Sequence, residues 1–233
     1  MYTTEAPPRP MHRQFPGGPP LAGLAAVSTA LLLTGLIAST AMAGTTFPSP
    51  FDSGASILVY FHSHQDAVKV SAFFQFAAAV PLAIYAATAS VRLRNLGIRA
   101  PGASIAFAGG VLAAVFLAVS GVVSWALAQP AVPASAPLVR ALCALSLPAG
   151  GPGSVVPFGL LIAGLAVPAA FGALLPRWLT ATGLILAVAA EFSSLCLLAS
   201  GFAYLLPVAR FGGLAWLITA GALLPTTRSR ASQ

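Results

Sequence analysis

Residues 71–99 read SAFFQFAAAVPLAIYAATASVRLRNLGIR, an apolar run that ends in three arginines. No charged side chain occurs between residues 71 and 91. An apolar stretch of about 20 residues is long enough for a helix to cross the hydrocarbon core of a bilayer. Lys and Arg beside such a stretch mark its cytoplasmic end. The run therefore predicts a transmembrane helix whose C-terminal end faces the cytoplasm.

The same pattern recurs along the chain. Charged residues make up 6% of the 233 residues and apolar residues 58%, and the mean hydropathy is +0.91. A soluble domain needs far more charge on its surface. We predict an all-α integral membrane bundle of six transmembrane helices. The expected spans are Leu21–Ala43, Asp66–Val91, Ser104–Ala128, Ser154–Leu175, Leu179–Gly201 and Leu205–Leu224.

The six spans leave room for short tails only. Residues 1–20 contain six prolines and no apolar periodicity, which predicts a disordered cytoplasmic tail. Residues 21–225 form the expected transmembrane domain, and residues 226–233 a second cytoplasmic tail. One alternative concerns the first span, because Ala41-Met42-Ala43 before Gly44 resembles a signal-peptidase site. Cleavage there would leave five spans with the same orientation.

The distribution of Lys and Arg predicts how the spans are oriented in the membrane. Eight of the eleven Lys and Arg residues fall on one side of the spans, namely Arg9, Arg13, Arg92, Arg94, Arg99, Arg177, Arg228 and Arg230. Lys69, Arg140 and Arg210 are assigned to the outer side or the outer interface. The positive-inside rule then predicts that both termini are cytoplasmic. Topology and anionic inner-leaflet lipids account for the net charge of +7, so no nucleic-acid partner is expected.

The loops on the outer side are expected to contain helices of their own. A helix is predicted to start near Ser53, lie in or near the outer interface, and run on into the second span. Residues 129–153 begin and end with prolines around a short helix, Ala136–Leu147. Residues 150–153, GGPG, lack the Lys of a phosphate-binding loop and predict a hinge before the fourth span. The turn at residues 176–178 makes spans four and five an antiparallel hairpin.

Helix association in lipid depends on small and polar residues. Small residues recur at i, i+4 in three spans: Gly35, Ser39 and Ala43; Gly159 and Ala163; Ala189 and Ser193. Tight packing within one bundle explains them, and a homo- or hetero-oligomer face is the alternative. Pro81 and Pro168 each remove a helical hydrogen bond, which kinks a helix for packing or beside a cavity.

Glu191 is the most informative single residue, because it lies near the middle of the fifth span. A charged carboxylate there costs at least about 2.5–3.5 kcal/mol on insertion scales. We therefore expect it to face the bundle interior. Two roles stay open: a proton or cation relay, or a neutral acid hydrogen-bonded to a neighbouring helix.

A second polar cluster precedes the second span, where residues 60–66 read YFHSHQD. On a helix His62, Asp66 and Lys69 share one stripe, while His64 points the opposite way, towards Gln75. These residues are candidates for an outer vestibule in contact with substrate or protons, or for a polar cap on the helix. A metal site from His62, His64 and Asp66 is a lesser alternative, because it needs a non-helical backbone.

No other chemistry is indicated. The sequence contains no CxxC, HExxH, P-loop, GxGxxG or GxSxG motif, and no pair of histidines lies on two different spans to hold a haem. We expect no catalytic residue, no cofactor and no enzyme activity. Cys143 and Cys196 are both on the predicted outer side, where a disulfide is conceivable and two free cysteines are the default.

Several stretches resemble a family of uncharacterised bacterial polytopic membrane proteins, a domain-of-unknown-function group. They are YFHSH at residue 60, SAFFQFAAAVPLAIYAAT at 71, SVRLRNLGIRA at 90, GGPG at 150, LLPRWL at 174 and WLITAGALLP at 216. The resemblance covers about residues 55–225. It implies a six-span protein of the cytoplasmic membrane and brings no activity or site residues.

Two functions are compatible with these observations. The first is a small transporter or proton-coupled permease-like module with Glu191 as its intramembrane acid. The second is a non-catalytic structural or accessory subunit that packs with a partner through its small-residue faces. The environment of Glu191 distinguishes them, because a relay must line a wet cavity and a structural acid must be sealed by a neighbour.

Overall fold

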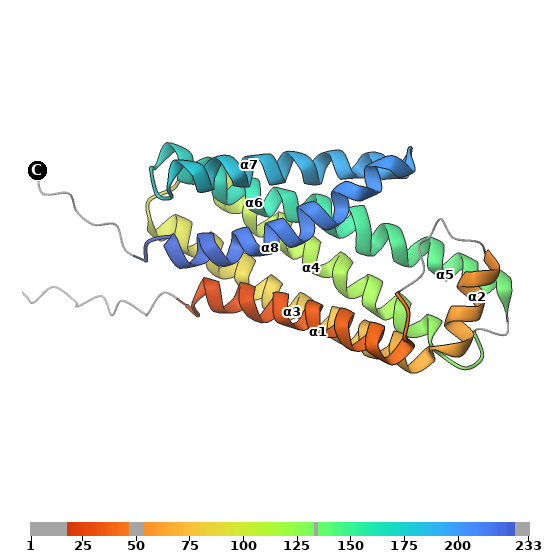
Figure 1. Ribbon diagram of the computed structural model, residues 1–233. Helices are drawn as coiled ribbons and strands as arrows, with labels where there is room; N and C mark the ends of the chain where they lie inside the picture. The colour runs from red at the N-terminus through yellow and green to blue at the C-terminus, as the bar shows by residue number, and fades with distance from the viewer. Residues whose placement is uncertain (1–17, 47–53, 133–134, 227–233) are drawn as a thin grey trace, which may run out of the picture.

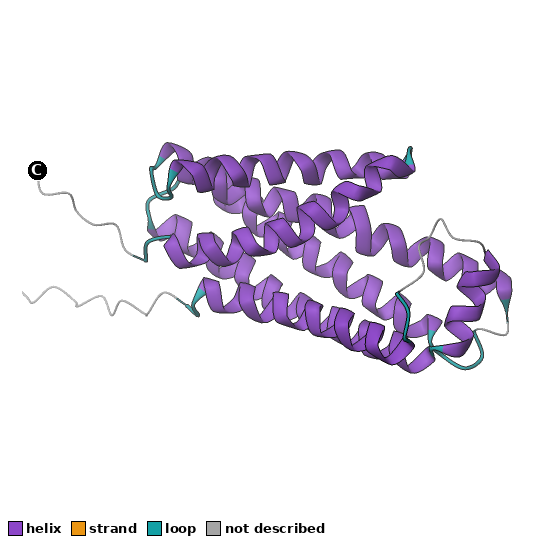
Figure 2. Ribbon diagram, viewed as in Figure 1, coloured by secondary structure: helices purple, strands orange, loops and turns teal. Residues whose placement is uncertain are grey.

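The computed structural model describes residues 18–46, 54–132 and 135–226, and within these ranges every regular element is a helix (Figures 1 and 2). The main helices are α1 (Leu21–Ala43), α2 (Gly54–Ser63), α3 (Gln65–Asn95), α4 (Gly102–Leu127), α5 (Ala136–Pro148), α6 (Ser154–Phe171), α7 (Arg177–Phe192) and α8 (Leu205–Leu223). A five-residue π-helical segment, η1 (Ala149–Gly153), joins α5 to α6, and two short 3-10 segments, η2 (Ser193–Leu197) and η3 (Ser200–Tyr204), join α7 to α8. The predicted tails lie almost entirely outside the described residues.

Six helical stretches are long and apolar enough to cross a membrane, as expected for a multi-pass membrane protein. They are Leu21–Ala43, Gln65–Asn95, Gly102–Leu127, Ala136–Phe171, Arg177–Leu197 and Ser200–Leu223. The predicted number of spans and the all-α class are therefore confirmed. The fourth stretch is longer than predicted, because α5, η1 and α6 follow one another without a break.

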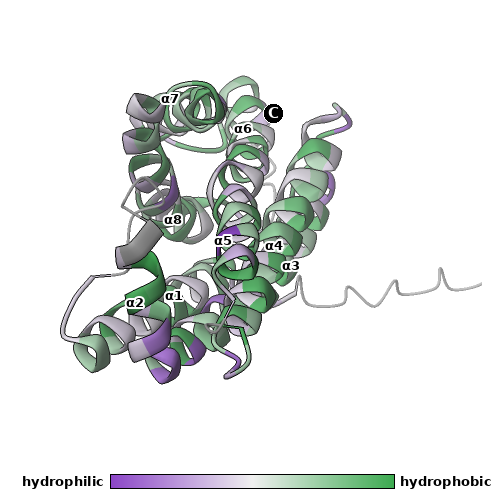
Figure 3. Cartoon of the chain, turned by 90° about the vertical axis from the view of Figure 1, so that its right-hand side faces the viewer, coloured by the Kyte–Doolittle hydropathy of each residue, from purple (hydrophilic) through white to green (hydrophobic). Residues whose placement is uncertain are grey.

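The six long stretches form a ring in chain order. α1 packs on α3, α3 on α4, α4 on α6, α6 on α7 and α7 on α8, and α8 returns to α1. Figure 3 looks along this ring from one end. The start of α1 and the end of α8, with the α3–α4 and α6–α7 connections, lie at the end that we call proximal (Figure 1). α2 and α5 lie at the opposite, distal end.

Small residues allow the helices to approach closely. A Cβ atom added at Gly35 of α1 would lie 2.6 Å from the Cβ of Phe74 in α3. One added at Gly164 of α6 would lie 2.4 Å from the backbone nitrogen of Ala106 in α4. Gly159 meets α7 at Ala190 in the same way. The predicted small-residue positions Gly35 and Gly159 therefore serve contacts within the bundle.

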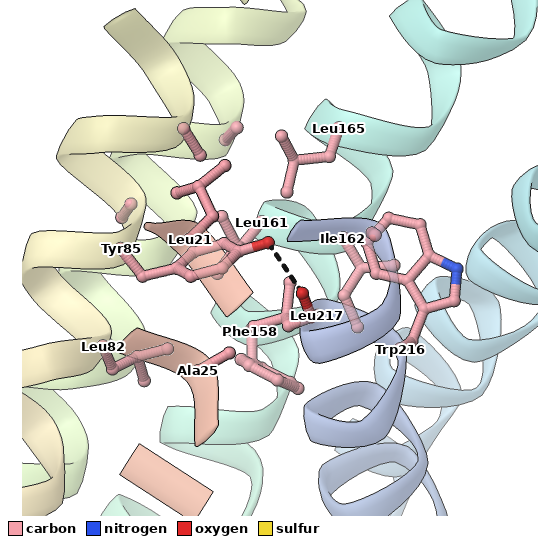
Figure 4. Packing of buried hydrophobic residues seen from close by; sticks show 14 of the residues in the cluster. Leu21, Ala25, Leu82, Tyr85, Phe158, Leu161, Ile162, Leu165, Trp216 and Leu217 are labelled. Carbon is pink, nitrogen blue, oxygen red and sulfur yellow. Dashed lines mark hydrogen bonds between the residues drawn. The ribbon is translucent and has the colours of Figure 1, made fainter. Parts of the chain in front are cut away.

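The main apolar core fills the proximal part of the ring, where α6 also contacts α8 (Figure 4). Three hydrogen bonds tie helices together there. Tyr85 of α3 donates its hydroxyl proton to the carbonyl oxygen of Leu217 in α8, at 3.2 Å. Trp216 of α8 donates to Leu179 O of α7, at 2.7 Å. Ser28 of α1 donates to Ala78 O of α3, at 2.9 Å. Each bond satisfies a polar side-chain group in an apolar region, where an unpaired one is costly.

Two connections decide the shape of the distal end. The helix expected to run from residue 53 into the second span is interrupted, because His64 has the non-helical dihedral angles φ −126° and ψ 37°. α2 consequently lies across the bundle rather than in line with α3 (Figure 1). The predicted hinge at residues 150–153 is present, since Gly151 has a non-helical ψ of −112°. α2 begins at Gly54, and the predicted start near Ser53 lies at the edge of a segment outside the described residues.

Candidate functional site

The distal half of the ring contains a cavity of about 390 Å³. We call it the distal cavity. Its walls come from α1, α2, α3, α4, α5, η1 and α8. The lining residues are Leu36, Ser39, Ile57, Phe61, Ser71, Gln75, Ser120, Ser124, Leu127, Cys143, Ser146, Leu147, Gly150, Gly151, Leu206, Pro207, Arg210 and Phe211. A volume of this size falls within the range of small-molecule pockets.

Arg210 is the charged residue of this lining. It lies in α8, thirteen residues before the end at Leu223, or about 20 Å along the helix axis. It lies inside the apolar stretch Ser200–Leu223. The sequence had assigned Arg210 to the outer side or outer interface. An intramembrane arginine is rare and usually faces a bundle interior or a cavity.

Two acceptors hold the guanidinium group. One terminal nitrogen, Nη2, donates to the carbonyl oxygen of Gly150 and, at 2.9 Å, to Ser154 Oγ. Both acceptors belong to the kinked connection between α5 and α6. Arg210 thus links α8 to the kink across the wall of the cavity.

The kink makes the Gly150 carbonyl available. In an α-helix this oxygen would accept the backbone N–H of Ser154, four residues later. Because Gly151 departs from helical geometry, the N–H of Ser154 donates to Gly151 O instead. The hydroxyl of Ser154 and the guanidinium of Arg210 replace the lost donor, the first at 2.6 Å. The sequence GGPG therefore creates the acceptor that positions the arginine.

The remaining N–H groups of Arg210 are uncommitted. Its Nε and Nη1 atoms have no hydrogen-bond acceptor in the described part of the chain, and none of its nitrogens is both fully buried and unpaired. Arg210 borders both the distal cavity and a small void beside Phe158 and Leu214. Of the two described carboxylates, Asp66 pairs with Lys69 at 3.0 Å and Glu191 is exposed. Among residues 18–46, 54–132 and 135–226, no acid neutralises Arg210.

Hydroxyl groups line the side of the cavity formed by α4 and α5. Ser120 Oγ donates to Ser146 O at 3.0 Å, and Ser124 Oγ lies 3.0 Å from Ser146 Oγ. Gln75 of α3, one of the predicted pathway residues, lies in the same lining beside Gly150. Its amide has no hydrogen-bond partner in the described structure and is not fully buried. The cavity therefore offers donors and acceptors around a single positive charge.

Apolar side chains lie next to the distal cavity on both sides along the bundle axis. At the distal end, Phe61 of α2 packs with Leu127 and Val139 in a separate apolar cluster, and Phe61 is only 1% exposed. At the proximal end, Arg210 and Ser154 border the side chains of Phe158 and Leu214, around a small void of about 20 Å³.

Glu191 does not face this site. Its side chain is exposed on α7, and its backbone oxygen accepts the hydroxyl of Ser194 at 2.6 Å. The prediction that Glu191 faces the bundle interior is therefore wrong. Apolar residues occur on all sides of α7. The composition of the helix therefore does not determine which of its faces turns towards the bundle interior.

The polar cluster at residues 62–69 is separate from the distal cavity. His62, His64 and Asp66 line a shallower polar hollow of about 430 Å³ at the distal end, near Met42. The expected stripe of His62, Asp66 and Lys69 on one helix is wrong, because the chain leaves the helix at His64. Lys69 pairs with Asp66 and borders a different, apolar groove. No group of three metal-ligating side chains occurs within the described residues.

The two cysteines are free thiols. Cys143 lies in the wall of the distal cavity, and Cys196 lies in η2, so the default of two unpaired cysteines is confirmed.

Sequence reasoning missed Arg210 as a site residue. Its signal was its position, five residues after the start of the sixth predicted span, with apolar residues on both sides. Assigning every Lys and Arg to a membrane side hid this signal. A basic residue within a span is better treated as a candidate site residue.

Comparison of the chain with protein-family models, with curated proteins and with solved structures finds no match. The resemblance to a bacterial polytopic family stays a prediction, and the function rests on the geometry of the site.

Proposed function

We propose that this protein is a carrier of the bacterial cytoplasmic membrane that binds a small organic anion in the distal cavity. Arg210 carries the proposal, because it lines the cavity and its charge meets no carboxylate in the described structure. Guanidinium groups bind carboxylates and phosphates through paired hydrogen bonds. The hydroxyls of Ser120, Ser124 and Ser146 supply further hydrogen bonds to such a ligand.

The energetics favour a bound anion. An arginine near mid-membrane depth costs about 2.5–3.5 kcal/mol on insertion scales. Two hydrogen bonds to neutral acceptors recover part of this cost, and a ligand carboxylate would recover more because it is charged. In this proposal both termini are cytoplasmic and the distal end faces outwards, as the distribution of arginines predicts. Arg210 takes the central place that the sequence had given to Glu191.

The proposal is tested with purified protein in a neutral maltoside detergent. Benzoate is compared with benzamide, which has nearly the same shape without the charge, and with benzylamine, which carries the opposite charge. Benzoate should raise the thermal unfolding midpoint, since a ligand at 100 times its Kd stabilises the folded state by about 2.7 kcal/mol. Benzamide and benzylamine should have little effect.

Arg210→Gln should remove the benzoate response. Arg140→Gln is the matched control, because Arg140 is exposed on α5 and should not alter it. Equal responses to benzoate and benzamide, or an intact response in Arg210→Gln, would contradict anion binding. Uptake of radiolabelled benzoate by proteoliposomes then separates a carrier from a protein that only binds.

A structural or accessory subunit is the second candidate function. The contact from Arg210 to Gly150 and Ser154 favours it, because it ties α8 to the α5–α6 kink. In that case Arg210→Gln should lower stability strongly, and no anion should stabilise the wild-type protein.

A further inference from the structure

α1 and α8 both contribute residues to the lining of the distal cavity. The two helices touch at the proximal end, where a Cβ atom at Gly221 of α8 would lie 2.7 Å from the backbone nitrogen of Ala22 in α1. They separate towards the distal end (Figure 1). Leu36 of α1 and Pro207 and Phe211 of α8 then border the cavity. We call this border the side opening.

The residues at the side opening face the membrane. Leu36 is 48% exposed and Phe211 is 40% exposed, and both lie within stretches long and apolar enough to span the bilayer. Leu36 and Phe211 therefore connect the cavity lining with the lipid-facing surface of the bundle.

The lining of the cavity is mixed. Hydroxyl groups come from Ser120, Ser124 and Ser146 of α4 and α5, and also from Ser39 of α1 and Ser71 of α3. Apolar side chains of α1, α2 and α8 border the cavity as well, namely Leu36, Ile57, Phe61, Leu206, Pro207 and Phe211. A ligand that matches this lining has a polar, negatively charged end at Arg210 and an apolar part towards the side opening.

We propose that the ligand is a single-chain amphiphilic anion, of the long-chain carboxylate type, which enters the distal cavity from the membrane between α1 and α8. Its head group binds the free N–H groups of Arg210 and the serine hydroxyls of α4 and α5. Its chain leaves past Leu36 and Phe211 into the lipid. This inference rests on the proposed function and adds the substrate class and the route.

Photolabelling tests the proposal on the full chain in phosphatidylcholine nanodiscs. The probe is dodecanoate with a photoreactive diazirine and an alkyne in its chain, and its methyl ester is the uncharged control. Labelling by dodecanoate should map to peptides of α1 and α8 that border the cavity. Arg210→Gln should lower it about tenfold or more, the factor expected for losing charge-assisted hydrogen bonds. The methyl ester should label wild type and variant equally weakly.

The route is tested separately by narrowing the side opening. Leu36→Trp should lower labelling about fivefold or more, because a larger side chain must be accommodated in the ligand's path. Val27→Trp is the matched control. Val27 is 52% exposed on the same helix, and nine residues turn it to the side opposite Leu36. Thermal unfolding of both variants confirms that they fold.

The outcomes distinguish the two proposals. If benzoate stabilises the protein through Arg210 but dodecanoate labels wild type and Arg210→Gln alike, the amphiphile is wrong and anion binding stands. If Leu36→Trp labels as well as Val27→Trp, the route between α1 and α8 is wrong. If neither benzoate nor dodecanoate depends on Arg210, both proposals are wrong.

Discussion

Replacing Arg210 by Met separates a ligand site from a structural contact. Met keeps most of the apolar stem of the side chain and removes the charge together with both hydrogen bonds, to Gly150 O and to Ser154 Oγ. Neither acceptor is left without a partner, because Ser154 Oγ still donates to Gly150 O at 2.6 Å. The stability change is therefore a balance between two lost bonds and one removed charge.

The free energy lost with the two hydrogen bonds and the free energy recovered by removing the charge are similar in size. A hydrogen bond to a charged group contributes about 1.5–3 kcal/mol, and the lower value applies where the acceptor already has a donor, so the two bonds lose about 3 kcal/mol. Removing an arginine from mid-membrane depth recovers about 2.5–3.5 kcal/mol. We expect Arg210→Met to change the free energy of unfolding by no more than about 1 kcal/mol. It should nevertheless lose the response to benzoate completely.

Equilibrium unfolding in mixed detergent micelles, followed by circular dichroism, measures this free energy. Arg140→Met is the control for removing a basic residue from an exposed position, and it should lie within about 0.5 kcal/mol of wild type. A loss above about 3 kcal/mol in Arg210→Met, with benzoate stabilisation retained, would refute the ligand site and leave the contact as a structural one.

Glu191→Gln should leave both stability and the benzoate response within about 0.5 kcal/mol of wild type, because the side chain is exposed; lost binding would show that it acts on the site. Gly164→Ala should lose about 2 kcal/mol or more in the unfolding assay, because its Cβ would meet backbone at 2.4 Å, while Gly201→Ala, with no neighbour within 4 Å, should lose almost nothing. Reporter fusions after Arg94 should read cytoplasmic and those at Ala134 external, and a cytoplasmic reading at Ala134 would break the proposed orientation.

The sequence by itself determined the features that depend on length and composition. A helix must satisfy its own backbone in lipid, so apolar runs of about 20 residues could only become spans. The hinge at residues 150–153 followed from Gly and Pro, whose backbone preferences act locally. These predictions agree with the six long stretches and with the kink at Gly151. The connection between spans four and five lies at residues 172–176 and not at the predicted 176–178, because Arg177 and Trp178 already belong to α7.

Only the tertiary structure decided which side chains face one another. In a membrane both the lipid and the bundle interior are apolar, so the two faces of a span differ little in composition and periodicity does not show which one is inside. That is why Glu191 was expected inside and is exposed, and why Arg210 was assigned to the outer interface and lines the cavity. The closing of the ring by α8 against α1, and their separation beside Arg210, arise from contacts between residues almost 200 positions apart, such as Ala22 and Gly221.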